Sequence, residues 1–163
     1  MNFYALRVSL VAADPQLFID ENMSKDIFSF EDALRYSVEN PPQDEHGDTI
    51  CSIKVQVEGR EEGVMAGIVS RAKALHGHDK EFNEYSVDDF PTLVWFWDRQ
   101  QQVILVEKKT SVLSTPTAAC KVFKKLANNL ELVEIGLRAE IEPVLNEKDH
   151  SFWEEYDRFE FVE

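Results

Sequence analysis

The sequence is poor in the residues that mark several special classes of protein. Of its 163 residues only 6 are glycine, 6 are proline and 2 are cysteine, which excludes a collagen-like repeat, a disulfide scaffold and a largely disordered chain. Apolar runs are short, and none approaches the about 20 residues that a helix needs to span a bilayer. Residues 1–13 alternate instead of forming a basic segment followed by an apolar one, as a secretory signal would. We therefore expect a cytoplasmic protein that does not enter a membrane.

What the chain does contain is enough apolar mass for one core and a large excess of acids. Apolar residues make up 44% of the sequence, and 31 acids face 17 bases, for a net charge of −14. Only residues 91–130 are locally basic, with 6 bases and 2 acids. The electrostatic field of a chain this acidic repels nucleic acid. We therefore expect weak or absent nucleic-acid binding unless the cations converge on one patch. The candidates for contacts with nucleic acid or phosphate are Lys108, Lys109, Lys121, Lys124 and Lys125.

Hydrophobic periodicity predicts the order of the secondary structure. Strict alternation predicts a strand at 2–12 and a hairpin formed by strands 51–58 and 64–71. A second hairpin, 93–97 with 103–106, is apolar on both faces, and we expect it to be central and covered on both sides. The remaining predictions are a helix capped by Ser29, a helix over 116–127 begun by Ser114 or Thr115, a strand from Leu132 to Pro143, a short helix opened by Ser151 and an extended segment at 159–162.

This order predicts a single α+β domain over 1–163, with a mainly antiparallel sheet and two or three short helices packed on it. Residues 72–90 show little periodicity and are interpreted as a long polar loop that is functional, mobile or carries a short helix. The pattern stops at Glu163 while a strand is still under way. Either that strand lies at an edge, or the chain is the N-terminal part of a longer protein.

Few residues point to catalysis. Glu107 and Lys109 follow an apolar strand, as the carboxylate and lysine of metal-dependent nucleases do. In a hairpin, however, Asp98 and Glu107 would lie about five residues, or about 16 Å, apart, too far to share a metal. We therefore expect no catalytic residue here.

Metal and thiol chemistry have no better support. His76, His78 and Asp79 lie in one polar stretch but lack further ligands at metal-binding spacing. Cys51 and Cys120 stand at positions where cysteine is usually a small buried apolar residue. We expect no metal and no cofactor. Consecutive aromatic residues at 95–97 point to alternate faces of a strand, so they cannot form one stacking platform for nucleic acid.

Residues 90–145 have a familiar order. Phe90-Pro91 is followed by a strand, a short turn, a second strand, a helix led by Ser-x-Pro, and a strand ending Ile141-Glu142-Pro143. This order resembles the N-terminal region of the phage exclusion proteins typified by lambda RexA, and of related phage-defence proteins. The resemblance implies a non-enzymatic component of phage exclusion that associates with itself and, in RexA, with DNA. This chain is shorter and more acidic than RexA, which argues against DNA binding and implies that a C-terminal region is missing here.

Three functions follow as hypotheses, of which the third is a hydrolase that uses Glu107 and Lys109. The first is an intracellular phage-defence module that acts by binding a protein partner, with self-association and DNA binding as further modes. The alternative is an acidic phage-encoded inhibitor that mimics DNA and binds a host nucleic-acid-binding protein. The acidic end of the chain motivates this alternative, and the partner-binding candidates there are Glu154, Glu155, Asp157 and Glu160.

Overall fold

The structure is a computed structural model, and it describes residues 2–14, 27–59 and 61–144. Six strands form an antiparallel sheet in the order β2-β3-β6-β7-β1-β8, and β4 and β5 form a separate two-stranded sheet. The α+β class and the antiparallel sheet with short helices are therefore confirmed. In chain order the elements are β1 (Phe3–Ala12), α1 (Ile27–Glu39), β2 (Cys51–Gly59), β3 (Val64–Arg71), β4 (Lys73–His78), β5 (Glu84–Asp89), β6 (Thr92–Asp98), β7 (Val103–Glu107), α2 (Pro116–Ala127), α3 (Leu130–Val133) and β8 (Leu137–Pro143).

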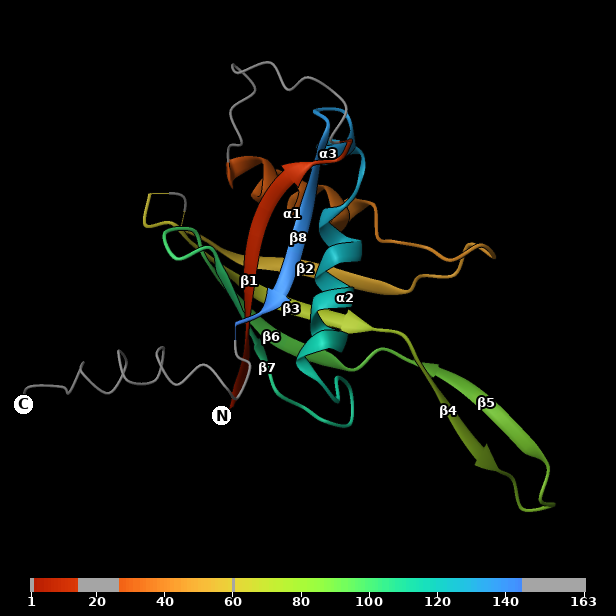
Figure 1. Ribbon diagram of the computed structural model, residues 1–163. Helices are drawn as coiled ribbons and strands as arrows, with labels where there is room; N and C mark the ends of the chain where they lie inside the picture. Colours follow the sequence, from red (N-terminus) through yellow and green to blue (C-terminus); the bar gives the residue numbers. More distant parts are fainter. Residues whose placement is uncertain (1, 15–26, 60, 145–163) are drawn as a thin grey trace, which may run out of the picture.

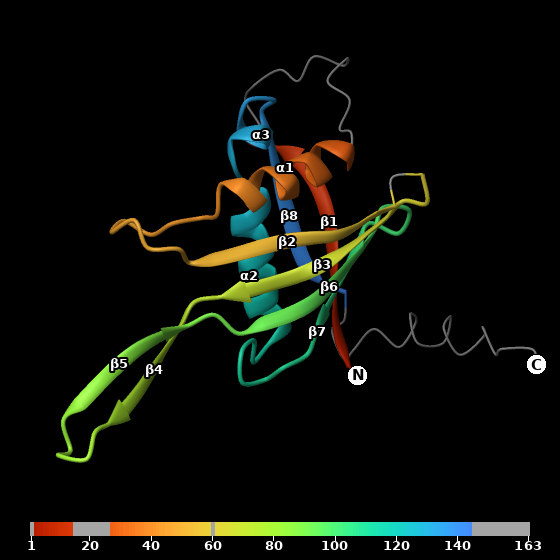
Figure 2. The ribbon, with the colours of Figure 1, turned by 180° about the vertical axis from the view of Figure 1, so that it is seen from behind.

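The helices lie together on one face of the large sheet (Figures 1 and 2). Helix α2 packs against β8, β1 and β2, and α1 packs against β2 and against both other helices. The opposite face of the sheet carries no helix in the part of the chain that the structure describes. Strands β6 and β7 are central, as predicted, but the expectation that both of their faces would be covered is wrong.

Alternation along β6 places its aromatic residues as the sequence predicts. Trp95 and Trp97 are fully buried on the helix side, whereas Phe96 is 39% exposed on the other face. The Trp95 ring meets the ring of Phe123 on α2 edge-on, and Trp97 packs against Phe30 on α1. The predicted inner face of α2 is confirmed, because Val122, Phe123 and Leu126 are all buried.

The ends of α2 follow from local capping. Thr115 is the N-cap, since its side chain accepts the backbone N–H of Ala118, and Pro116 occupies the first helical turn, where a missing N–H costs nothing. Asn128 closes the helix. The two alternatives for the helix start, Ser114 and Thr115, are thereby resolved in favour of Thr115.

Two predicted boundaries are wrong. Helix α1 already includes Ile27, so Ser29 lies inside the helix and does not cap it. The strand expected from Leu132 begins only at Leu137, because Asn129 caps a further helical turn, α3, through its side-chain oxygen. Gly136, with φ of 68°, then reverses the chain into β8.

A buried carboxylate ties α1 to the end of β6. Glu31 Oε1 accepts the indole N–H of Trp97 at 2.9 Å and the Arg99 Nε–H at 2.7 Å, and Oε2 accepts from Arg99 Nη2 at 3.0 Å. Burial raises the pKa of this carboxyl group, but the bonds from Arg99 and Trp97 outweigh it, and the pKa lies below its ordinary value. Arg35, one turn along α1, adds a weaker ionic contact at 3.7 Å.

The β2–β3 hairpin contains a bulge that needs a glycine. Its register shifts between Val55 and Val57, where β2 bends across β3. A Cβ atom on Gly67 would lie 1.8 Å from the carbonyl oxygen of Lys54. A side chain is therefore incompatible with this close approach of the two backbones.

None of the described helices is long and apolar enough to cross a membrane.

Candidate functional site

Residues 73–89 form an arm that projects from the body of the protein (Figure 1). The arm is the β4–β5 hairpin, so the prediction of a long loop over 72–90 is wrong. In its register Leu75 pairs with Val87 and Gly77 pairs with Tyr85. Because paired residues share a face, these four line one side of the arm, and Ala74, His76 and Ser86 line the other. We call the first side, together with Phe82 at the tip, the arm face.

The arm face is apolar and open to solvent. Leu75 is 46% exposed, Tyr85 51%, Val87 53% and Phe82 86%. An isolated two-stranded hairpin is marginally stable in water, and it normally packs against a further element. Large apolar side chains gathered on such a hairpin are typical of an interaction surface.

Local contacts hold the arm and its tip in shape. The ring of Tyr85 lies over Gly77, where an added Cβ atom would be 2.5 Å from the ring. At the tip, Asp79 accepts the backbone N–H groups of Glu81 and Asn83 and the side-chain amide of Asn83. The bonds from Asn83 lower the pKa of Asp79 below its usual range. This turn holds Phe82 at a φ of 62°.

The arm continues the hairpin made by β3 and β6. Ser70 pairs with Thr92, and three positions further along Lys73 pairs with Asp89, so the two ladders are in step. The arm face therefore continues the inner face of the large sheet, where Val69 and Leu93 are buried under the helices. In the arm the same face extends beyond the helices that cover the large sheet, so it is open to solvent.

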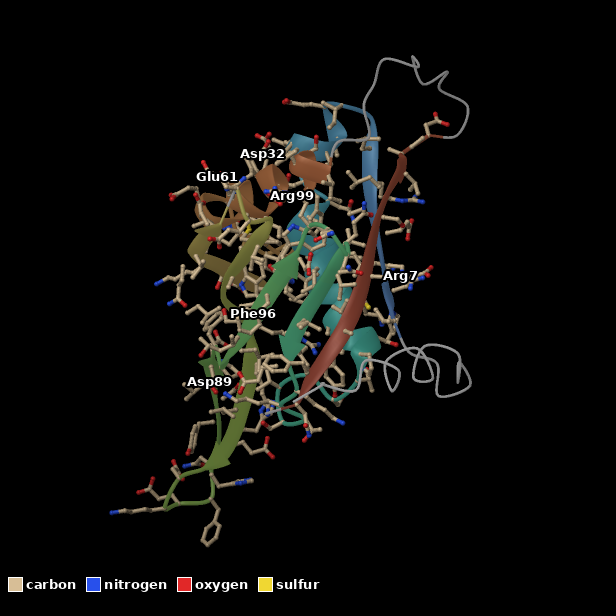
Figure 3. The ribbon with its side chains drawn as sticks, turned by 90° about the vertical axis from the view of Figure 1, so that its left-hand side faces the viewer. Arg7, Asp32, Glu61, Asp89, Phe96 and Arg99 are labelled. Carbon is tan, nitrogen blue, oxygen red and sulfur yellow. The ribbon has the colours of Figure 1, made fainter. Side chains whose placement is uncertain are left out.

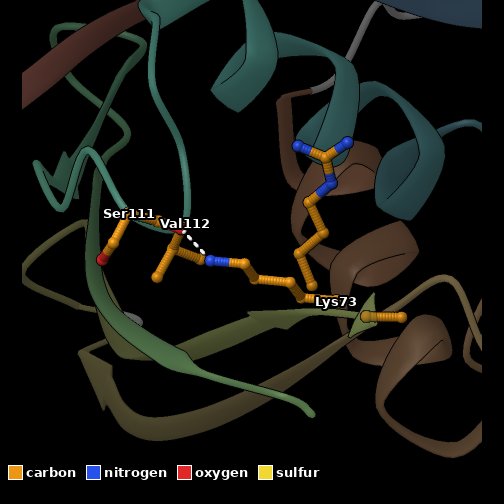
Figure 4. A pocket seen from close by; sticks show the side chains of 5 residues that line it. Lys73, Ser111 and Val112 are labelled. Atoms are coloured by element: carbon orange, nitrogen blue, oxygen red, sulfur yellow. Dashed lines mark hydrogen bonds between the residues drawn. The ribbon is translucent and has the colours of Figure 1, made fainter. Parts of the chain in front are cut away.

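A small cavity lies where the arm joins the body (Figure 4). It has a volume of about 200 Å³ and is lined by Arg71, Ala72, Lys73, Ser111 and Val112. Lys73 Nζ donates to the backbone carbonyl of Ser111 at 2.7 Å, which fastens the start of β4 to the loop before α2. The arm thus has a fixed base with two cations beside it.

A second apolar surface crosses the uncovered face of the large sheet. One row of directly paired residues runs from β1 to β2 through Ala5, Leu105, Phe96, Ala66 and Val57. Its central members, Phe96 and Leu105, are each 39% exposed. In Figure 3 the strands lie in front of α2, and Phe96 and Arg7 are labelled on this face. We call this the open-face row.

The five predicted cations fall into two groups. Lys108 and Lys109 follow β7, whereas Lys121, Lys124 and Lys125 lie on α2. Three of them already have partners: Lys108 Nζ lies 5.6 Å from the ring centroid of Tyr4, Lys109 pairs with Glu107 at 3.4 Å and Lys124 pairs with Glu140 at 3.9 Å. The carboxylates beside Lys109 and Lys124 offset the positive charge of these two side chains, so they attract a phosphate less strongly.

Glu107 has a structural role. Its Oε2 accepts the backbone N–H of Val94 at 3.1 Å, and its other oxygen faces Lys109. Asp98 pairs with Val103 at the far end of the β6–β7 ladder, which confirms the register that separates the two carboxylates. This arrangement does not place Asp98 and Glu107 around one metal ion.

The remaining candidates can be placed briefly. Within residues 2–14, 27–59 and 61–144, no three histidine, cysteine or acidic side chains gather as metal ligands. Cys51 and Cys120 are buried, and burial raises the pKa of each thiol to about 11. The predicted helix at Ser151, the extended segment 159–162 and the acidic candidates lie outside the described residues; those acids are Glu154, Glu155, Asp157 and Glu160.

The sequence reasoning missed the arm face entirely. A signal was present, since Leu75 and Gly77 alternate with His76 and His78, and Tyr85 and Val87 alternate with Ser86 and Asp88. The charged turn between the two runs and the small number of apolar residues in each concealed it.

Comparison of the chain with protein-family models, with curated proteins and with solved structures found no match. The resemblance of residues 90–145 to phage exclusion proteins therefore stays a prediction.

Proposed function

We propose that this chain is a protein-binding module and that the arm is its docking element. The observation that carries the proposal is the exposure of Leu75, Tyr85 and Val87 on one face of a projecting hairpin, with the exposed Phe82 at its tip. Full burial of an exposed large apolar side chain contributes on the order of 1.5 to 3 kcal/mol, and Leu75, Tyr85 and Val87, which are about half exposed, would contribute about half of that each. A partner that covers the arm face also supplies the packing that an isolated hairpin lacks.

The shape of the surface favours a protein over a small molecule. The arm face is an extended strip about 20 Å long, from six residues at about 3.3 Å each. Small ligands bind instead in enclosed cavities of about 300 to 1,000 Å³. The cavity at the arm base is smaller, at about 200 Å³, and opens to the surface beside two cationic side chains.

The charge of the chain argues in the same direction. A net charge of −14 opposes approach to nucleic acid, and Lys109 and Lys124 already face carboxylates. The proposed partner is accordingly a protein surface with apolar side chains. Phage exclusion in the bacterial cytoplasm is our proposal for the setting, and the resemblance of residues 90–145 supports it.

An arm variant tests the proposal in cells. Leu75→Ser with Val87→Ser removes the centre of the arm face, and Ala74→Ser with Ser86→Ala makes matched changes on the opposite face. We expect the first variant to restore phage plaques on bacteria that express the chain and to lose proteins captured from infected cells. The control variant should behave as the parent does. Equal capture and equal plaque counts for both variants would refute docking through the arm.

The excess of acids supports the alternative, a DNA mimic that binds a nucleic-acid-binding protein. In that case duplex DNA should displace the partner, and arm variants should bind as the parent does. Neutralising the acidic candidates outside the described residues should then abolish binding; the changes are Glu154→Gln, Glu155→Gln, Asp157→Asn and Glu160→Gln. Displacement by DNA together with this loss would favour the mimic over the arm.

A further inference from the structure

The arm face has a polarity from base to tip. Lys73 and Asp89 pair at the base, Leu75 and Val87 follow, and then come Gly77 and Tyr85, which precede the tip. Two arms laid face to face in opposite directions would place the Leu75–Val87 pair of each copy near the Gly77–Tyr85 pair of the other. The two apolar centres would then cover each other.

Charge distinguishes the two possible directions. The tip carries Asp79, Glu81 and Glu84 against the single cation Lys80, whereas at the base Arg71 and Lys73 line the cavity and offset Asp88 and Asp89 at the end of β5. Antiparallel arms bring each acidic tip to a base of balanced charge that presents Arg71 and Lys73, whereas parallel arms bring two acidic tips together. Like charges that face each other are unfavourable, so the antiparallel arrangement is the one that the charges support.

The cavity at the base is placed to receive the tip. It lies where the arm face meets the loop before α2, and its lining includes Ser111 and Val112 from that loop. The tip presents Phe82, 86% exposed and held by the Asp79 turn. Arg71 and Lys73 would meet both the Phe82 ring, through cation–π contact, and the neighbouring carboxylates.

We propose that the occupant of the arm face is a second copy of this chain, joined to the first by antiparallel arms related by a two-fold axis. Both halves of the contact, an acidic tip with an exposed Phe82 and a base whose cavity is lined by two cations, are present on one chain, so an isologous interface uses each of them twice. This inference rests on the proposed function, because it names the protein that docks on the arm.

The small size of the contact indicates a weak association. An arm face about 20 Å long and about 10 Å wide, two strands across, presents on the order of 200 Å². Two faces and two tip contacts remain well below the about 1,600 Å² of a standard interface. We therefore expect a reversible dimer with a dissociation constant in the micromolar range or above, in exchange with the monomer.

Sedimentation equilibrium of the full chain, from about 1 µM to about 1 mM, measures this association. Leu75→Ser with Val87→Ser should weaken the dimer more than about tenfold, because it removes four apolar side chains from the two-fold contact. The matched control, Ala74→Ser with Ser86→Ala, should stay within about twofold of the parent. Far-ultraviolet circular dichroism and thermal unfolding of each variant check that the body remains folded.

Charge reversal tests the antiparallel geometry. Arg71→Glu places an acid at the base, and Glu81→Lys places a base at the tip. Each variant alone should dimerise about tenfold more weakly, since two attractive contacts become repulsive. An equimolar mixture of the two should form heterodimers at the parent's strength, because each reversed tip then meets a reversed base. In parallel arms like charges already face each other in the parent, so neither variant alone should dimerise more weakly. The loss in each single variant together with recovery in the mixture therefore identifies antiparallel arms.

Three outcomes would overturn the inference. A chain that stays monomeric up to about 1 mM has no such dimer. If the chain stays monomeric while Leu75→Ser with Val87→Ser still loses phage exclusion, a different protein occupies the arm. The proposed function then stands. Dimerisation that is unchanged in the arm variant would assign the contact to another surface, such as the open-face row. If the mixture of Arg71→Glu and Glu81→Lys does not dimerise at the parent's strength, the antiparallel arrangement is excluded.

Discussion

The ion pair between Glu31 and Arg99 predicts a large and pH-dependent contribution to stability. Glu31 is 1% exposed and accepts three hydrogen bonds, from the Trp97 indole and from two guanidinium nitrogens of Arg99. Glu31→Ala would leave the Arg99 charge and the buried Trp97 N–H without this acceptor. Breaking a buried pair by removing one partner costs about 3 to 5 kcal/mol. We expect a loss of free energy of unfolding in that range, measured by urea titration at pH 7.

Asp32 provides a matched control on the next residue of the same helix. Its side chain is 57% exposed and pairs with Arg35 at 3.1 Å. Exposed pairs of this kind contribute about 0 to 1 kcal/mol. Asp32→Asn should therefore change the free energy of unfolding by less than about 1 kcal/mol. A loss below about 1 kcal/mol for Glu31→Ala as well would refute the role of Glu31.

The pH dependence has a definite sign. The pKa of Glu31 is lower in the folded chain than its ordinary value of 4.5, so the folded state binds the proton more weakly than the unfolded state does. The stabilisation is fully present above that ordinary value and is lost as the pH falls through the folded pKa. The stability difference between the parent and Glu31→Gln should therefore shrink on acidification below pH 4.5. A difference that stays constant from pH 7 to pH 3 would contradict this assignment.

Three further predictions concern the body of the protein. Phe123→Ala should lower the free energy of unfolding by about 3 to 5 kcal/mol in denaturant titration, because it empties the centre of the core, and a loss below about 1 kcal/mol would mean that this face of α2 is not packed. Gly67→Ala should cost more than about 2 kcal/mol, since its Cβ atom would collide with the Lys54 carbonyl, and unchanged thermal unfolding would show that the bulge can relax. With a thiol pKa of about 11, Cys51 and Cys120 should react slowly with iodoacetamide at pH 8 until urea unfolds the chain, as mass spectrometry would show; rapid labelling of the native chain would contradict their burial.

The parts of the fold that could be predicted are those with a strong local signal. Strict alternation over residues 51–58 identified β2, and the Thr115-Pro116 start with an apolar stripe identified α2. The prediction for α1 began too late because Ser29 resembles an N-cap. Ile27, one turn before Phe30, already packs against the core and extends the helical stripe backwards.

Helix α3, which follows α2 directly, shows how one residue type serves two roles. The helix predicted over 116–127 ends as the structure has it, with Asn128 as its C-cap. Asn129 also begins α3: its side-chain oxygen accepts the N–H of Glu131, while its amide donates to the carbonyls of Ala33 and Leu126. These bonds bring together segments that are far apart in the sequence. Local periodicity over residues 130–136 therefore could not distinguish α3 from the start of a strand.

The candidate site escaped prediction for a related reason. Apolar residues on both faces of β6 and β7 predicted two covering layers, yet the structure provides one layer of helices and leaves Phe96 and Leu105 on an uncovered face. The same holds in the arm, where Leu75 and Val87 continue the inner face beyond α2. Hydrophobic periodicity indicates which side chains avoid water. It does not indicate whether the residues that cover them belong to the same chain.

The continuity of β3 with β4 and of β5 with β6 links the fold to the proposed function. Because the pairing is in step on both sides of Ala72, the arm is an extension of a central hairpin and not an insertion at a sheet edge. Its base is fixed twice, by the β3–β6 ladder and by the bond from Lys73 to Ser111. A hairpin fixed in this way keeps its apolar face in one orientation, which lowers the conformational entropy lost when a partner docks. Lys73→Met removes both the bond to Ser111 and the charge that would face the partner's acidic tip, while it keeps a side chain of similar length, and it should weaken docking on the arm while Leu75 and Val87 are unchanged. Binding by this variant at the strength of the parent would show that the β3–β6 ladder alone fixes the arm and that the Lys73 charge takes no part in the contact.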